Sequence, residues 1–310
     1  MFSVFKIPVL GCRLDLFLKI LFSQYSRTFL KKIILNNEVF INGNICCNPD
    51  KKISYKDLIV ISFTIYKEKY YLAEKISLNI VYEDNDILVI DKQDNFIVHP
   101  GAGIKSGTLL NALLYKDNVF FNVPRAGIVH RLDKNTTGLM VIAKTVLAYY
   151  NLINQIKLKK VVREYQAIVY GRVISGGTII KPIIRNPYKR ISMMVNQCGK
   201  IAITHYRVIQ RYSYHTHLKI KLETGRTHQI RVHMLYINFP IVGDQLYGNK
   251  YKFYKNIKEE FFQEIRAFSR QALHASKLCL YHPVTQCFME WNSELPKDIL
   301  NLIKLLNCNM

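Results

Sequence analysis

Three short segments hold the residues whose types and spacing could support chemistry. The first is GIVHRLDKNTTGLMVIAK, in which Asp133 lies among His130, Arg131 and Lys134. Two interpretations suit such a carboxylate. It can be a structural acid, because Asp, Asn, Thr and Gly all favour turns and helix caps. It can instead be a nucleophile or a general base.

The second segment is ETGRTHQIRVH, in which four basic side chains follow one another closely. His228 and His233 are five positions apart and no H-E-x-x-H motif is present, so the spacing does not favour a metal site. An arginine held near a buried aspartate is the preferred interpretation, because it would keep the carboxylate ionised and oriented. If a helix begins at Thr227, then Thr227, Arg231 and Leu235 lie on one face of it, four positions apart.

The third segment is REYQAIVYG, which has the alternation of a strand. Tyr165 should point to the opposite face from Glu164 and Gln166. Its ring could pack in a core, or it could stack on a base extruded from RNA. Elsewhere HPGAG (residues 99–103) lacks P-loop spacing, and neither G-x-G-x-x-G before a helix nor G-x-S-x-G occurs. A dinucleotide cofactor and a serine hydrolase are therefore unsupported.

The charge balance points to a polyanionic partner. Lys and Arg number 44 against 22 Asp and Glu, which gives a formal net charge of +22. Nucleic acid is the usual partner of such an excess. The alternative is a compositional bias toward Lys, Ile, Asn and Tyr, as AT-rich genomes produce. With 49% hydrophobic residues the composition is that of a globular protein.

Cysteine usage and apolar patterning indicate the compartment. The seven cysteines form no C-x-x-C pair, so neither zinc nor a disulfide framework is expected. The apolar N-terminus is interrupted by Lys6, Pro8 and Arg13 and is not followed by a cleavage site for a signal peptide. No apolar run reaches the length of about 18 residues that a membrane span needs. We therefore expect a cytoplasmic protein without a membrane partner.

The N-terminal part predicts a small helical and hairpin unit. Apolar residues from Leu14 onward have helical spacing, Ser26 suits the N-cap of a second helix, and EVFINGN reads as a strand entering an Asn-Gly turn. This could be an RNA-binding module or an ordinary small α/β domain. Residues 11–65 resemble the S4 domain, an RNA-binding module, and DLIVISF closes it as a strand. The basic residues then expected to bind RNA are Arg13, Arg27, Lys31 and Lys32.

The rest of the chain predicts an α+β domain. A charged linker is expected over residues 66–77, followed by two strands joined by a turn at Glu83–Asp86 and by a helix over 107–115. Alternating strands follow Val161. Many strands with few helices indicate a large mixed, mainly antiparallel β-sheet flanked by helices. The helices expected in the second half cover residues 227–237, 257–268 and 298–306.

The three chemistry-bearing segments resemble, in order, the three motifs of the RluA-type RNA pseudouridine synthases. HPGAG and RQALHASKLCLYHP extend the likeness, which makes residues 78–306 the catalytic domain. The resemblance implies that Asp133 is the catalytic aspartate, that Arg231 pairs with it and that Tyr165 stacks on the target uracil. It also implies that four residues bind the substrate: Arg131, Ile230, Arg226 and His130. Among them, Arg131 would help to displace the base and Ile230 would form part of the pocket wall.

The resemblance also implies the reaction and the partner. The reaction is isomerisation of uridine to pseudouridine without a cofactor or metal. Its substrate would be 23S rRNA at the helix 69 hairpin loop, in the large ribosomal subunit or its precursors, and the enzyme would be a monomer. Asn135 departs from the family pattern, where a second acid is expected. The aspartate could add to C1′ or act as a base on the ribose, and both routes stay open.

Three other functions remain open at the level of sequence. The chain could be a non-catalytic RNA-binding or ribosome-assembly protein that keeps the fold. It could modify another rRNA or tRNA site. It could also be a carboxylate-based nucleosidase, which would need a second acid such as Glu223 or Asp244 and would release free uracil.

Overall fold

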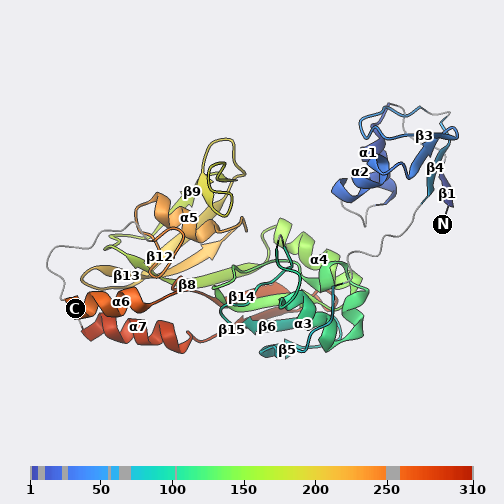
Figure 1. Cartoon of the computed structure of the whole chain (residues 1–310). Helices are drawn as coiled ribbons and strands as arrows, with labels where there is room; N and C mark the ends of the chain where they lie inside the picture. Colours follow the sequence, from blue (N-terminus) through green and yellow to red (C-terminus); the bar gives the residue numbers. More distant parts are fainter. Residues whose placement is uncertain are drawn as a thin grey trace. The chain divides into compact units, whose positions relative to one another are not determined.

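The computed structural model describes residues 2–5, 11–22, 27–54, 57–62, 71–101, 103–248 and 259–308, which form two separate units (Figure 1). The first unit is Met1–Tyr70 and the second is Tyr71–Met310. Each unit has a hydrophobic core of its own.

The first unit pairs two helices with a small antiparallel sheet. Buried apolar residues from both helices and from the strands, among them Leu14, Phe17 and Ile59, form one core. Asn42 and Gly43 have φ values of 52° and 81°, as a two-residue hairpin turn requires, so the predicted Asn-Gly hairpin is present. Ser26 lies outside the described residues. The elements are α1 (Leu14–Leu21), α2 (Arg27–Leu35), β1 (Phe2–Phe5), β2 (Val39–Ile41), β3 (Asn44–Ile45) and β4 (Ile59–Ser62), in the sheet order β1-β4-β2-β3. Strand β1 precedes the first residue of the predicted domain and was not anticipated.

The second unit is built on a nine-stranded sheet with the order β5-β6-β7-β14-β8-β13-β12-β9, and β15 pairs with β14. Only the pairing of β7 with β14 is parallel among those described, so the expected mixed, mainly antiparallel sheet is confirmed. The strands are β5 (Ile80–Glu83), β6 (Ile87–Lys92), β7 (Thr137–Ala143), β8 (Val162–Tyr170), β9 (Gly177–Ile180), β12 (Ile203–Arg211), β13 (His215–Leu222), β14 (Leu273–Tyr281) and β15 (Phe288–Asn292). A separate hairpin contains β10 (Ile183–Arg185) and β11 (Met193–Val195).

Helices cover the sheet on both faces. Every residue of β7 is buried, and successive residues such as Leu139 and Met140 point to opposite faces and belong to two different cores. Helix α3 (Leu109–Lys116) packs into the core that holds Met140, and α4 (Val146–Lys157) packs into the core that holds Leu139. The C-terminal helices α6 (Glu259–Ala267) and α7 (Lys297–Cys308) join α3 on the first of these cores. Strands covered on both faces read as continuous apolar runs, as β7 does.

The parallel pairing of β7 with β14 depends on a glycine. Gly138 has φ 112°, and a Cβ atom there would lie 2.3 Å from the carbonyl oxygen of Ala275. Only glycine permits this approach of two backbones. The glycine of the N-T-T-G motif therefore sets the strand that follows Asp133 directly against β14.

The described part of the predicted linker packs onto the second unit. Tyr71 and Ile76 lie against its core, and the carboxylate of Glu74 accepts a hydrogen bond from the Gly107 amide at 2.9 Å. Residues 71–77 therefore belong with the second unit. No helix in the described part of the chain is both long and apolar enough to span a bilayer.

Candidate active site

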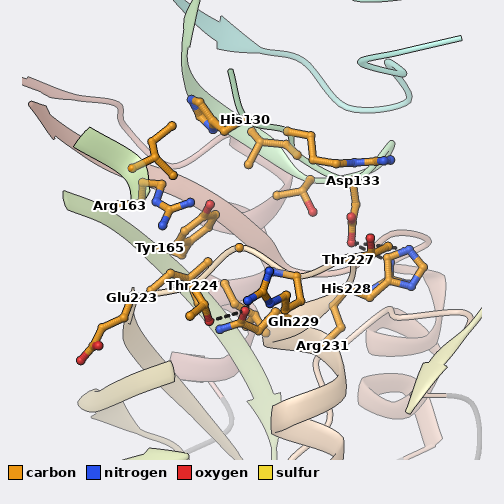
Figure 2. A pocket seen from close by; sticks show the side chains of 18 of the residues that line it. His130, Asp133, Arg163, Tyr165, Glu223, Thr224, Thr227, His228, Gln229 and Arg231 are labelled. Atoms are coloured by element: carbon orange, nitrogen blue, oxygen red, sulfur yellow. Dashed lines mark hydrogen bonds and ion pairs between the residues drawn. The ribbon is translucent and has the colours of Figure 1, made fainter. Parts of the chain in front are cut away.

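Residues from all three chemistry-bearing segments line one pocket of about 580 Å³ (Figure 2). The loop that precedes β7 contributes Asp133, and β8 contributes Tyr165. The turn after β13 and helix α5 (Gln229–Tyr236) contribute the basic cluster that contains Arg231. The sheet order explains why these residues come together. Strands β7 and β8 pair with opposite edges of β14, and β13 pairs with the other edge of β8.

Arg231 links two carboxylates. Its Nη1 donates to Asp133 Oδ2 at 2.9 Å. Its Nε and Nη2 donate to the two oxygens of Asp244 at 2.6 and 2.9 Å. Burial alone would lower the pKa of Arg231, but the hydrogen bonds and charges of Asp244 and Asp133 raise it instead. The guanidinium is therefore a fixed cation that orients Asp133.

Asp244 is a fully buried anchor for this arginine. Besides Arg231, its Oδ1 accepts the backbone amides of Leu246 and Tyr247 at 3.0 and 3.1 Å. Both oxygens of this carboxylate accept hydrogen bonds from fixed donors, so the group orients Arg231 and presents no free oxygen to a substrate. This geometry argues against Asp244 as the second acid of a nucleosidase.

The loop that carries Asp133 is held through its backbone. The buried amine of Lys92 donates to the carbonyl oxygen of Lys134 at 3.0 Å, and burial lowers the pKa of this amine to about 7. Arg270 Nη1 donates to the Asn135 carbonyl oxygen at 3.1 Å, so Asn135 contributes its backbone to the loop. These bonds leave the Asp133 side chain directed at Arg231.

His228 forms the turn into α5. It adopts a left-handed conformation (φ 55°) and precedes the first helical residue, Gln229. The expectation of a helix beginning at Thr227 is therefore wrong, and Thr227 does not share a helical face with Arg231. His228 Nδ1 lies 2.9 Å from the Tyr247 hydroxyl, and its Nε2 lies 4.0 Å from Asp133 Oδ2. Burial outweighs the attraction of Asp133 and lowers the pKa of His228.

Comparison with known proteins shows the family of this chain. A family model described as RNA pseudouridylate synthase matches residues 86–236. The ribosomal large subunit pseudouridine synthase D of Buchnera aphidicola subsp. Baizongia pistaciae is 66% identical over 305 residues, which cover 98% of this chain and 96% of that protein. The chain belongs to the RNA pseudouridylate synthase family. The protein with the same name from Salmonella typhimurium is 49% identical over 97% of this chain and 92% of its own length.

Solved structures of this family share the fold. Human RNA pseudouridylate synthase domain containing 4 superposes with a TM-score of 0.58 at 22% identity, over 74% of this chain and 93% of that chain. Human RNA pseudouridylate synthase domain containing 1 gives 0.54 at 23% identity, over 76% and 96%. The chain is thus a pseudouridine synthase by sequence, and its second unit has the fold of these enzymes.

Within this pseudouridine synthase, the four residues expected to bind substrate all line the pocket. Ile230 is buried, and Arg131 and Arg226 are exposed at the rim. Arg226 Nε donates to the Ile201 carbonyl oxygen at 3.1 Å. His130 Nε2 accepts the Val141 amide at 3.0 Å, and burial lowers its pKa to about 3. His130 is therefore a neutral ring that holds β7.

Sequence reasoning missed the part played by two residues, Asp244 behind the pocket and Arg163 on its wall. Asp244 was considered only as a second acid, and its pairing with Arg231 was not foreseen. Arg163 on β8 was not singled out, although its position two residues before Tyr165 places both side chains on one face. Glu223, the other proposed acid, pairs with Lys159 and lies 2.7 Å from His205 Nε2.

A possible cation site lies outside this pocket. Ligand atoms of Asp84, Asp86 and His282 lie within 4.8 Å of one another. His282 Nε2 lies 3.1 Å from Asp84 Oδ2, and its Nδ1 accepts the amides of Val284 and Thr285 at 3.3 and 3.1 Å. Both ring nitrogens are therefore engaged, and the cluster fits a structural hydrogen-bond network better than a metal centre.

The basic residues expected to bind RNA in the first unit are largely engaged with one acid. Asp15 is fully buried, and Arg27 and Lys31 lie 2.8 and 3.6 Å from its Oδ2. Arg13 pairs with the same carboxylate at 3.1 Å. Lys32 is exposed on α2. Arg27 and Lys31 therefore hold α2 to α1, and Arg13, the residue before α1, pairs within its own helix, in addition to any contact with RNA.

Proposed function

We propose that this pseudouridine synthase isomerises uridines of 23S rRNA in the large ribosomal subunit or its precursors, at the helix 69 hairpin loop. The target is supported by relatives named ribosomal large subunit pseudouridine synthase D, which are 46–66% identical over nearly their whole length. The chemistry is supported by one observation above all. Asp133 lies 2.9 Å from a fixed arginine inside a pocket that also holds Tyr165.

The reaction needs a carboxylate that stays ionised. The N1–C1′ bond breaks and its electron pair leaves with the uracil ring. Asp133 either forms a bond to C1′ or removes a ribose proton. The ring turns and C5 forms the new bond to C1′, while the Asp133–C1′ bond breaks on the first route or Asp133 returns the proton to the ribose on the second. The C5 proton is then lost to solvent and N1 takes up a proton. Arg231 serves both routes, because its Nη1 donates to the carboxylate at 2.9 Å and orients it.

The pocket provides for an extruded base. Removing a uridine from its stack costs a few kcal/mol, and less in a loop than in a duplex. The exposed Arg131 at the rim is placed to contact the displaced strand, and the buried Tyr165 and Ile230 offer an aromatic face and an apolar wall. Stacking on an aromatic side chain is worth about 1–3 kcal/mol per base, which offsets the cost of extrusion.

The rest of the molecule supplies affinity for RNA. The net charge of +22 favours binding to phosphates. Residues 11–65 act in this proposal as an S4 domain that makes a second contact and raises the effective concentration of the catalytic unit on rRNA. The enzyme works as a monomer in the cytoplasm, where ribosomal subunits are assembled.

The test is to map pseudouridine in 23S rRNA by carbodiimide modification and reverse transcription. Free 23S rRNA and assembled large subunits, both lacking pseudouridine, would be incubated with the protein. Stops in the helix 69 loop are expected. Stops elsewhere would keep the reaction and replace the proposed target, and no stop on either substrate would leave an RNA-binding protein without this activity.

A further inference from the structure

Arg163 is a buried cation to which the described part of the chain offers no acidic partner. Its side chain belongs to β8, lines the active-site pocket and is 6% exposed. Within the described residues it forms no ion pair, and its buried Nε has no hydrogen-bond partner. Figure 2 shows it beside Tyr165 on the pocket wall.

The other two buried arginines show what is missing. Arg231 donates to both oxygens of Asp244, and Arg270 donates to both oxygens of Asp298. A buried charge without such a partner is costly. A guanidinium left unpaired inside a substrate pocket therefore indicates that the substrate brings the negative charge.

The surroundings of Arg163 place this charge at the base. Arg163 and Tyr165 are two positions apart on one strand, so their side chains leave the same face. Burial raises the pKa of Tyr165, and the positive charge of Arg163 opposes that rise. The Nη1 of Arg163 would lie 3.0 Å from a Cβ atom at Gly225, so the guanidinium reaches the turn that precedes α5.

We propose that Arg163 binds the detached uracil ring and stabilises its negative charge. This inference rests on the proposed isomerisation. When the N1–C1′ bond breaks, its electron pair stays on the ring and spreads to the carbonyl oxygens. An N–H group of Arg163 donates to one of these oxygens while the ring turns. The charge disappears when C5 bonds to C1′, the C5 proton is lost to solvent and N1 takes up a proton.

A backbone phosphate is the other possible source of negative charge. Arg125, Arg131, Arg226, Lys157 and Lys159 line the same pocket and are exposed, as phosphate contacts on the outside of a strand require. Arg163 instead lies buried beside the proposed stacking ring. Depth and position therefore favour the base over the phosphate.

The test compares Arg163→Ala and Arg163→Lys with the wild type on an rRNA fragment that the wild type modifies. Arg207→Ala is the control, because Arg207 is an exposed arginine on β12 of the same sheet. Single-turnover rate constants at saturating enzyme, the RNA Kd and the thermal unfolding midpoint are measured. Each rate is measured with uridine and with 5-fluorouridine at the target, whose fluorine stabilises the ring anion by itself. Conversion of 5-fluorouridine is followed as its loss from nuclease digests.

We expect Arg163→Ala to slow turnover of uridine by about 100-fold, as removal of one donor to a developing anion does. The RNA Kd should stay within about twofold of the wild type, and the loss on 5-fluorouridine should be several-fold smaller. Arg163→Lys should recover part of the rate. Arg207→Ala should match the wild type.

Three results would overturn the inference. A raised Kd with an unchanged rate at saturation would assign Arg163 to a phosphate. An equal loss on both substrates, together with a lower unfolding midpoint, would assign it to structure. An unchanged rate for Arg163→Ala would remove it from the site. If the wild type modifies no RNA, the proposed function fails and the inference fails with it.

Discussion

At the scale of single residues, Arg231 has two tasks in one geometry. It neutralises the buried Asp244, and it presents a fixed N–H group to Asp133. Arg226 lies only five positions earlier but is exposed, and its Nε donates to a backbone carbonyl oxygen. The two arginines should therefore respond very differently to substitution.

We predict that Arg231→Ala reduces turnover by at least about 100-fold, whereas Arg226→Ala stays within about tenfold of the wild type. Arg231→Ala also leaves two carboxylates without their cation, which should lower the free energy of unfolding by about 3–5 kcal/mol. Activity and thermal unfolding would be measured together. The conservative Arg231→Lys keeps the charge, and a larger loss for Arg226→Ala than for Arg231→Lys would show that the wrong partner was assigned to Asp133.

Asp244→Asn tests the anchor rather than the reacting group. The amide keeps the shape but loses the charge that fixes the guanidinium, so Arg231 should orient Asp133 less well. We expect turnover to fall by about 10–100-fold with little change in RNA Kd, because Asp244 is fully buried. Glu223→Gln is the matched control on a partly exposed carboxylate. Equal losses for the two variants would argue against an anchoring role.

That Asp133, Tyr165 and Arg231 line one pocket could be predicted from sequence, but the residues that hold them there could not. Asp133, Tyr165 and Arg231 stand in motifs whose spacing is recognisable. Asp244 lies in a turn after α5, and no local pattern tells a buried anchor from an exposed turn acid. Arg163 looks like any polar residue of a strand until the pocket on its face is known.

At the scale of elements, the parallel contact of β7 with β14 positions the Asp133 loop. Gly138→Ala should disrupt this contact, because the new Cβ would lie 2.3 Å from the Ala275 carbonyl oxygen and φ is 112°. We expect a loss of at least about 3 kcal/mol in the free energy of unfolding, measured by denaturant titration.

Gly101→Ala is the control, since nothing lies within 4 Å of its Cβ position and its φ is not in the left-handed region. That variant should stay within about 0.5 kcal/mol of the wild type. If Gly138→Ala proved equally harmless, the proposed constraint on the strand after Asp133 would be wrong.

In the first unit, the charges around Asp15 predict a difference between neighbouring cations. Arg27→Ala removes two hydrogen bonds to a buried carboxylate and should lower the free energy of unfolding by about 1–3 kcal/mol. Lys32→Ala should leave stability within about 0.5 kcal/mol, because Lys32 is exposed. Thermal unfolding of the two variants compares them directly, and equal midpoints would contradict the assignment.

The same cluster sets a dependence on pH. Burial alone would raise the pKa of Asp15, but Arg13 and Arg27 lower it from 3.8 to about 2. Because the folded-state pKa is depressed, the stabilisation is fully present above pH 3.8 and is lost as the pH falls through about 2. Asp15→Asn should remove this part of the acid sensitivity. An unchanged acid transition in that variant would show that Asp15 is not its source.

Element types were easier to predict from sequence than element boundaries. The Asn-Gly hairpin and the alternating strands β8, β12 and β13 follow from local pattern. Helix α5 begins at Gln229 because His228 takes a left-handed turn, which the apolar pattern does not show. Strand β1 was missed because its four residues pair with β4, more than fifty positions away in sequence.

At the scale of the whole molecule, the pocket and the cluster of cations around Asp15 belong to different units. The second unit holds the pocket, and the first holds a cluster of cations around Asp15. The net charge of +22 belongs to the whole chain and makes RNA affinity dependent on salt. We expect turnover at saturating RNA to depend on the residues of the pocket, and RNA affinity to depend on the charge of the whole chain.

The most direct test of this account is the fate of the hydrogen at C5 of the target uridine. 23S rRNA labelled with tritium at C5 would be incubated with the wild type and with Asp133→Asn, and tritium in water and in free uracil would be counted. The account predicts tritium release to water by the wild type, a loss of at least about 10³-fold for Asp133→Asn and an unchanged RNA Kd. Release by Asp133→Asn at the wild-type rate, or label appearing as free uracil, would contradict it.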